Sequence, residues 1–368
     1  MCKDLLNKRI YDTQQEMKKN GLEALIIGSS ADFSYYFGKH PRPTERFLAI
    51  IIPLKGKASL IVPSLDVKNY ITYKEEVNII DWEDSENPID ILVDLLREGD
   101  INVIGTNNDL WSVFVYRIKN QNPELVVTEG SSIIARLRLL KTESEINALQ
   151  KAAEKIDEVW NEFILNTSHI VGKTENQIRA YIMRLMFERG FEEVAWCDVG
   201  SGPNSATPLH VGSERKIQKR DPIVIDFAGK YQGYCADTCR TIVAKEPEPE
   251  FVKIYELVKN AQKSVTENVR EGITCSKLDS IARDIISGEN YEEYFIHRTG
   301  HGIGLDYHED PYIVKGNNLK LQTGMVFSNE PGIYIPNLWG VRIEDIIALS
   351  QSGIKVLNNT NRELVALP

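Results

Sequence analysis

The chain has 368 residues, with 43 lysines and arginines against 53 aspartates and glutamates, so its net charge at neutral pH is −10. Hydrophobic residues make up 42% and charged residues 26%, a composition that is typical of a globular protein and excludes disorder as the main state. The acidic balance argues against a nucleic-acid-binding protein, because such proteins gain affinity by neutralising phosphates. The length favours two domains.

No segment resembles a membrane span or an export signal. The longest plain apolar run, from Phe47 to Leu54, is far shorter than the roughly 20 residues that cross a bilayer. The first residues include no apolar stretch of the secretory kind. We therefore expect a cytoplasmic protein without a membrane partner. The few dispersed cysteines favour neither a disulfide framework nor a zinc ribbon.

Residues 1–130 alternate between helical and strand patterns, which predicts a compact α/β domain followed by a linker at 131–141. This part contains one histidine, His40, and no dense polar cluster, so we expect the active site elsewhere. The predicted helices are Asp4–Asn20, Pro88–Arg97 and Asp109–Lys119. The predicted strands are Ala24–Gly28, Phe33–Phe37, Arg46–Ile52, Ala58–Val62, Asn102–Gly105 and Leu125–Val127.

Residues 142–368 repeat one order of elements twice: helix, helix, histidine-containing loop and β-hairpin. Thr142 and Thr174 each stand three residues before a glutamate or glutamine, the capping-box pattern that begins a helix. The two predicted hairpins lie in Ile223–Val243 and Met325–Leu349. Because the halves share little residue identity, the repeat is one of architecture. The whole chain is therefore predicted to be an α+β protein.

Acidic residues stand inside both predicted hairpins. A turn centred at Tyr231 and Gln232 would place Asp226 opposite Asp237. Acids are depleted in strand interiors, and two opposed carboxylates repel each other unless a cation lies between them.

The second hairpin shows the same arrangement, since a turn centred on Asn337 would place Glu330 opposite Glu344. One such pair is compatible with an exposed sheet edge. Two pairs in matched hairpins, each within apolar strands, favour a metal site.

Three histidines, His297, His301 and His308, follow one another closely in the loop before the second hairpin. Four carboxylates and one imidazole suit two divalent ions. An oxygen-rich set without thiolate favours Mn²⁺ or Co²⁺, with Fe²⁺ or Zn²⁺ as alternatives, over a tetrahedral structural zinc. Two such ions can share a hydroxide and clamp a scissile carbonyl, as in many hydrolases.

Six short strings carry a resemblance to the pita-bread metallopeptidases, and within them to the branch of Xaa-Pro dipeptidase (prolidase) and Xaa-Pro aminopeptidase. Residues from about 135 onward resemble the pseudo-twofold catalytic domain of that family, and residues 1–130 resemble its creatinase-type N-terminal domain. The strings are Ser201–Ala206, Gly233–Asp237, Thr299–Gly304, Tyr307–Glu309, Glu330–Gly332 and Val341–Asp345.

The resemblance implies hydrolysis of the Xaa-Pro bond in dipeptides, in longer peptides or in both, through a hydroxide that bridges two ions. It also implies a homodimer. Asp226 would bind one ion, Asp237 and Glu344 would bridge both, and His301 and Glu330 would complete the second site. Glu330 would also be the general base, which passes a proton to the leaving nitrogen.

His308 and His210 would flank the substrate and stabilise the tetrahedral intermediate or the leaving group. Arg342 would contact the substrate or form a structural salt bridge, and His297 would support the site. Tyr312 stands where archaeal-type prolidases often carry an arginine that suits a dipeptide's carboxylate. We therefore expect dipeptides and longer peptides to be cut, the longer ones at least as well, with Tyr312 and Arg342 contacting the substrate.

Two alternatives stay open. A methionine aminopeptidase-like enzyme shares the metal set, although its catalytic domain does not need the N-terminal domain. A non-catalytic pita-bread module would serve for binding alone, although such modules usually lose metal ligands, and all five are present here.

Overall fold

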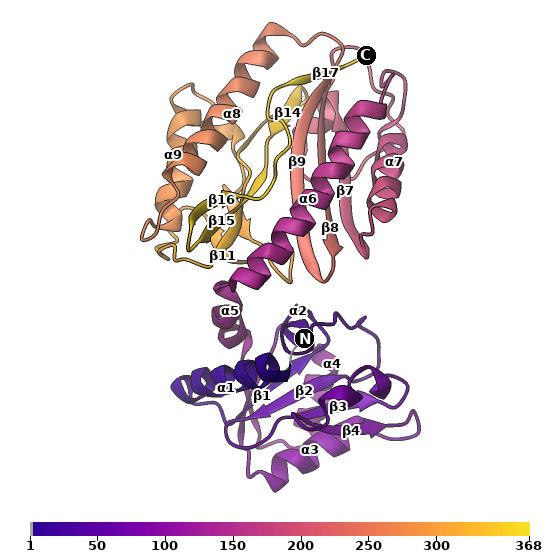
Figure 1. Cartoon of the computed structure of the whole chain (residues 1–368), viewed down its shortest axis with the longest axis vertical. Helices are drawn as coiled ribbons and strands as arrows, with labels where there is room; N and C mark the ends of the chain where they lie inside the picture. Colours follow the sequence, from indigo (N-terminus) through magenta and orange to yellow (C-terminus); the bar gives the residue numbers. More distant parts are fainter. Residues whose placement is uncertain (1–2) are drawn as a thin grey trace. The chain divides into compact units, whose positions relative to one another are not determined.

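The computed structural model describes residues 3–368 and divides into two compact units, one ending at Arg138 and the other running from Leu139 to Pro368 (Figure 1). The N-terminal unit is built on a six-stranded sheet in the order β4-β3-β2-β1-β5-β6, and β2 pairs antiparallel with both its neighbours. Its elements are α1 (Lys3–Asn20), β1 (Ala24–Gly28), α2 (Ala31–Phe37), β2 (Ala49–Pro53), β3 (Ser59–Pro63), β4 (Asn78–Trp82), α3 (Pro88–Glu98), β5 (Val103–Thr106), α4 (Ser112–Gln121), β6 (Val126–Glu129) and α5 (Ser131–Leu139).

The predicted strand at Phe33–Phe37 is wrong, because this segment is the helix α2. The Ser30 side chain accepts a hydrogen bond from the backbone N–H of Phe33, and Gly38 ends the helix in the left-handed region with φ 65°. All of α2 is buried, so apolar residues occupy every side of the helix. Its sequence therefore lacks the alternation of apolar and polar faces that indicates a surface helix. In the N-terminal unit, sequence reasoning also missed the strand β4, and the helix α5 within the segment interpreted as a linker.

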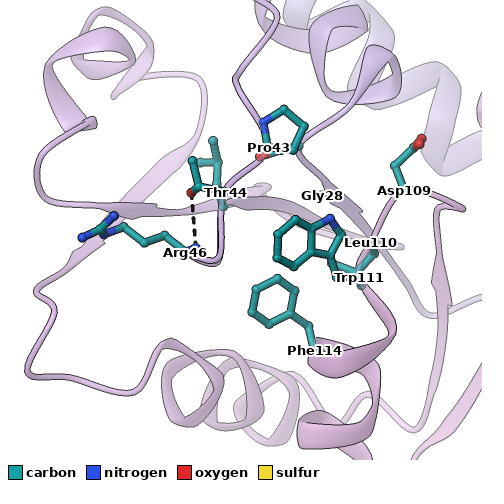
Figure 2. A pocket seen from close by; sticks show the side chains of 10 residues that line it. Gly28, Pro43, Thr44, Arg46, Asp109, Leu110, Trp111 and Phe114 are labelled. Carbon is teal, nitrogen blue, oxygen red and sulfur yellow. Dashed lines mark hydrogen bonds between the residues drawn. The ribbon is translucent and has the colours of Figure 1, made fainter.

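A small pocket of the N-terminal unit lies between β1, the segment before β2 and the start of α4 (Figure 2). The Trp111 and Phe114 rings stack in it with centroids 6.2 Å apart. Its charged lining residues are Arg46 and Asp109, and it contains no histidine or cysteine. These side chains do not form the donor cluster of a metal or nucleophile site.

The C-terminal unit consists of two halves with matching layers (Figure 1). In the first half, the helices α6 and α7 pack on the strands β7–β9. In the second half, α8 and α9 pack on the sheet β11-β10-β12-β15-β16. Each half has its own apolar core. The elements are α6 (Glu143–Asn166), α7 (Glu175–Glu188), β7 (Glu193–Ser201), β8 (Pro222–Tyr231), β9 (Tyr234–Ala244), α8 (Pro249–Asn268), α9 (Cys275–Ser287), β10 (Gly300–Gly302), β11 (Glu309–Ile313), β12 (Val326–Asn329), β13 (Gly332–Ile335), β14 (Trp339–Arg342), β15 (Asp345–Ser350), β16 (Gly353–Val356) and β17 (Val365–Leu367).

Both predicted capping boxes are confirmed at the starts of α6 and α7. The Thr142 side chain accepts from the backbone of Glu145, whose carboxylate bonds back to the Thr142 N–H, and Thr174 and Gln177 exchange the same pair of bonds. The reciprocal bonds satisfy donors that the first helical turn leaves free. Among the described residues, no helix combines the length and apolar character needed to cross a bilayer.

Candidate metal centre

The first acidic pair lies on the hairpin β8–β9, but its alignment differs by two residues from the predicted one. The two-residue turn is Gln232–Gly233, and both residues have positive φ, which suits the twist of a tight hairpin. Asp226 is therefore opposite Cys239, and Asp237 is opposite Ala228. The two acids are diagonal neighbours on one face of the sheet, close enough for their side chains to interact.

The second acidic pair has the predicted alignment. The strand ladder keeps one register on both sides of Glu330 and Glu344, so these residues face each other across the strands, and Asn337 occupies the turn with φ 65°. The register is given by the flanking pairs, Asn329 opposite Asp345 and Gly332 opposite Arg342.

Three side chains, from β9, from β10 and from the link between β14 and β15, meet in a buried cluster. One ligand atom each of Asp237, His301 and Glu344 lie within 4.8 Å of one another. Glu330 joins them, because its Oε1 lies 3.1 Å from His301 Nε2, which is 3.8 Å from Asp237 Oδ2. His301 Nδ1 lies 3.1 Å from the carbonyl oxygen of Gly302. A proton on Nδ1 would leave Nε2 available as a ligand.

The cluster has the electrostatic character of a cation site. Asp237 Oδ1 and Glu344 Oε1 are buried and have no hydrogen-bond partner in the described structure. Burial, and then the charges of neighbouring carboxylates, raise the pKa of Asp237 and of Glu344 well above their usual range. An unpaired buried carboxylate is costly unless a proton or a cation neutralises it. The donor set therefore fits a hard divalent ion.

Glu330 differs from the other two acids because it is ionised. Burial acts to raise its pKa, but the hydrogen bond and charge of His301 outweigh burial and lower the pKa to about 2. The hydroxyl of Ser328 donates to Glu330 Oε1 over 3.0 Å. Glu330 is thus held as a carboxylate at the edge of the cluster, in a suitable state to accept a proton.

Asp226 lies beside this cluster, but its oxygens contact other groups. Trp196 Nε1 donates to Asp226 Oδ1 over 2.7 Å, and Arg342 forms a buried ion pair with Oδ2. Each carboxylate oxygen has two lone pairs, so Asp226 can keep these bonds and still face an ion. Arg342 also donates to Tyr334 Oη over 2.6 Å. Of the two interpretations left open for Arg342, these contacts favour the structural ion pair.

His308 adjoins the cluster from the histidine loop. Its ring lies edge-on to that of His301, with centroids 4.2 Å apart, and stacks on Trp196 at 5.5 Å. Burial, followed by the neighbouring charges of His301 and Arg298, lowers the pKa of His308 to about 4. At neutral pH His308 is therefore an uncharged imidazole that can donate or accept one hydrogen bond at each nitrogen.

His297 has both ring nitrogens occupied. Its Nδ1 donates to the carbonyl oxygen of Arg298 over 2.7 Å, and its Nε2 lies 2.9 Å from Tyr334 Oη. Burial lowers the pKa of His297. These contacts support the interpretation of His297 as a structural residue of the site.

Sequence reasoning did not identify Glu175, the buried carboxylate that organises the loop of His210. His210 Nε2 lies 2.8 Å from Glu175 Oε2, and Ser213 Oγ donates to the same oxygen over 2.6 Å. Ser201 donates to Oε1 from both its backbone N–H and its hydroxyl, each over 2.7 Å, and the Asn204 amide reaches both oxygens over 3.1 Å. In the sequence Glu175 appears only as part of a capping box.

We expect Glu175→Gln to destabilise the C-terminal unit by about 1.5–3 kcal/mol at pH 7, because an amide cannot accept all of these hydrogen bonds. Burial acts to raise the pKa of Glu175, but hydrogen bonds from Ser213, Ser201 and His210 lower it. Its stabilising contribution is therefore complete above the ordinary pKa of about 4.3 and is lost as the pH falls through the lowered pKa.

Denaturant unfolding of wild type and Glu175→Gln at pH 7 and pH 3.5 measures this difference. Glu188→Gln, at an exposed position of the same helix, controls for the loss of charge. A stability difference that does not narrow at pH 3.5 would show that the carboxylate charge is unimportant.

Residues 147–351 match the profile described as Metallopeptidase family M24, and residues 9–140 match that of the Creatinase/Prolidase N-terminal domain. The chain belongs to metallopeptidase family M24. Its fold is accordingly a pita-bread domain preceded by a creatinase-type domain, as expected from the sequence.

Several relatives of the family span nearly the whole chain. The probable dipeptidase PepE of Mycobacterium tuberculosis is 36% identical over 355 residues, which are 95% of this chain and 93% of the relative. The Xaa-Pro dipeptidase of Pyrococcus horikoshii is 36% identical over 363 residues, 98% of this chain and 100% of the relative. The crystal structure of prolidase from Thermococcus sibiricus matches with a TM-score of 0.92 and 38% identity, covering 100% of both chains.

Proposed function

We propose that this protein is a metal-dependent peptidase that hydrolyses the Xaa-Pro bond and releases the N-terminal residue of its substrate. The buried group of Asp237, His301 and Glu344, whose ligand atoms lie within 4.8 Å of one another, carries this proposal. The relatives named Xaa-Pro dipeptidase, which match both domains, support this specificity over a methionine aminopeptidase-like one. We extend the proposal to a homodimer, as the family resemblance implies, and to a cytoplasmic location, the expectation from the sequence.

The residues that would hold two divalent ions are Asp226, Asp237, His301, Glu330 and Glu344. We propose Mn²⁺ or Co²⁺, because carboxylate oxygens and one imidazole nitrogen suit these ions. When bound, such a pair activates water at neutral pH and polarises a carbonyl group. The orphaned oxygens of Asp237 and Glu344 support this assignment, since a cation would satisfy both.

The chain's own side chains would handle the proton and the leaving group. Glu330 is ionised, and its Oε1 faces the cluster. It would accept a proton and deliver it to the prolyl nitrogen. His308, neutral at pH 7, would donate a hydrogen bond to the oxygen that gains charge in the transition state. His210, oriented by Glu175, would flank the substrate.

Chelation followed by reconstitution tests the proposed function. Protein stripped of metal should not cleave Ala-Pro or Ala-Pro-Ala, and activity should return with Mn²⁺ or Co²⁺, because the bound ions would lower the pKa of the attacking water. The measurement is the initial rate of hydrolysis of Ala-Pro, Ala-Pro-Ala and Met-Ala-Ala under the same conditions.

Activity that persists with no detectable metal would contradict the proposal. Cleavage of Met-Ala-Ala in preference to both proline peptides would favour the methionine aminopeptidase-like alternative. Metal binding without cleavage of any of these peptides would favour a binding module.

A further inference from the structure

A dipeptidase must recognise the free carboxylate that lies directly beyond the scissile bond. Tyr312 cannot provide a positive charge for it, and the two candidates for a substitute charge, Arg342 and His210, contact Asp226 and Glu175. The structure places a cation at this position: the Arg298 guanidinium lies over the Tyr312 ring, with its carbon 4.6 Å from the ring centroid. Stacking of this kind fixes the plane of a guanidinium and leaves its N–H edge available for an oxyanion.

Arg298 is a cation of this region without a carboxylate partner. Within residues 3–368, no carboxylate lies within ion-pair distance of its guanidinium, and its side chain is half-buried. Neighbouring cations already have carboxylate partners. They are Arg342 with Asp226, Arg283 with Asp279 and Lys141 with Glu309.

The backbone on both sides of Arg298 is fixed. Arg283 donates to the carbonyl oxygen of His297 over 2.6 Å, and His297 Nδ1 donates to the carbonyl oxygen of Arg298 over 2.7 Å. On the other side, the Thr299 N–H donates to the carbonyl oxygen of Ile313 over 3.0 Å. The main chain is thus held against β11, so the position of the guanidinium depends on its stacking with Tyr312.

Arg298 also lies beside the candidate catalytic groups. Gly300, two residues after Arg298, pairs with Ile313, the neighbour of Tyr312, and His301 follows Gly300 on the same strand. The His308 ring contacts that of His301, with centroids 4.2 Å apart. Along β11, Ile313 belongs to the apolar core and Tyr312, its neighbour, points to the opposite face. The stacked Arg298–Tyr312 pair therefore lies beside β10, which carries His301, and on β11, which directly follows His308, the residue proposed to contact the reacting group.

We propose that Arg298, held by stacking on Tyr312, binds the carboxylate of an Xaa-Pro dipeptide and makes the enzyme prefer dipeptides to longer peptides. This inference rests on the proposed function. It replaces the expectation that longer peptides are cut at least as well, because that expectation did not consider Arg298.

The test compares kcat/KM for Ala-Pro, Ala-Pro amide and Ala-Pro-Ala in the metal-loaded protein. Wild type should prefer Ala-Pro to its amide by more than tenfold. Arg298→Met should have a kcat/KM for Ala-Pro about 10- to 100-fold below that of wild type, mainly because KM rises. Its kcat/KM for the amide should change less than threefold. Arg298→Lys should recover part of the loss, since lysine offers a charge without the bidentate fork. Arg270→Met, at an exposed position, is the matched control.

Equal losses on the dipeptide and on its amide would overturn the proposal, since a structural defect affects both. A second measurement does not depend on hydrolysis. Calorimetry should show that metal-loaded wild type binds L-proline at least tenfold more tightly than Arg298→Met does, while both bind prolinamide equally. Equal affinity for proline would overturn the role of Arg298. Selective proline binding without hydrolysis of any Xaa-Pro peptide would support Arg298 and contradict the proposed function.

Discussion

Glu330→Gln is expected to lower kcat for Xaa-Pro hydrolysis by about 10³-fold, within the range that general bases contribute. Glutamine has no basic oxygen to accept the proton, but its carbonyl oxygen can still accept the hydrogen bond that Ser328 now donates over 3.0 Å. The substitution should therefore preserve the fold. Steady-state kinetics under saturating Mn²⁺, together with circular dichroism and metal content, provide the measurement.

His308→Ala is the comparison for this variant. It should lower kcat by a smaller factor, on the order of 10²–10³, as expected for a donor to developing negative charge. If Glu330→Gln turned over at a near-normal rate while retaining its metal, another residue would have to be the base.

Glu344→Gln is expected to remove the stabilisation that the protein gains from divalent metal, together with its activity. A ligand at 100 times its dissociation constant stabilises a folded protein by about 2.7 kcal/mol. Wild type should show a gain of this order with Mn²⁺, and the variant should show little, because Glu344 is one of the residues proposed to hold the ions. Without metal the variant should be at least as stable as wild type, since Glu344 is buried beside other acids that raise its pKa.

Unfolding curves with and without Mn²⁺ measure this effect, and metal analysis of the dialysed proteins accompanies them. Glu292→Gln removes the same charge from an exposed position and should keep the full metal response. A Glu344→Gln variant that retained two ions and the wild-type gain in stability would exclude Glu344 from the metal site.

The acidic pattern and the helix starts were predictable because each depends on residues close together in the chain. A capping box involves four consecutive positions, and those of Thr142 and Thr174 are formed. The alignment of Glu330 with Glu344 followed from a turn at Asn337, the residue that adopts positive φ. In the first hairpin a one-residue error in the turn, which lies at Gln232–Gly233, displaced the predicted pairing by two positions.

What the sequence by itself determined is therefore the local chemistry: which acids and histidines stand within apolar strands, and where the helices of the C-terminal unit begin. Tertiary packing decided the rest. The helix α2 forms where burial on all sides hides its periodicity. Glu175 contacts a loop 26 or more residues away, and Arg342 pairs with Asp226 across 116 positions. Such contacts arise from long-range packing that brings distant strands together, so no spacing in the sequence reveals that Arg298 lies on Tyr312.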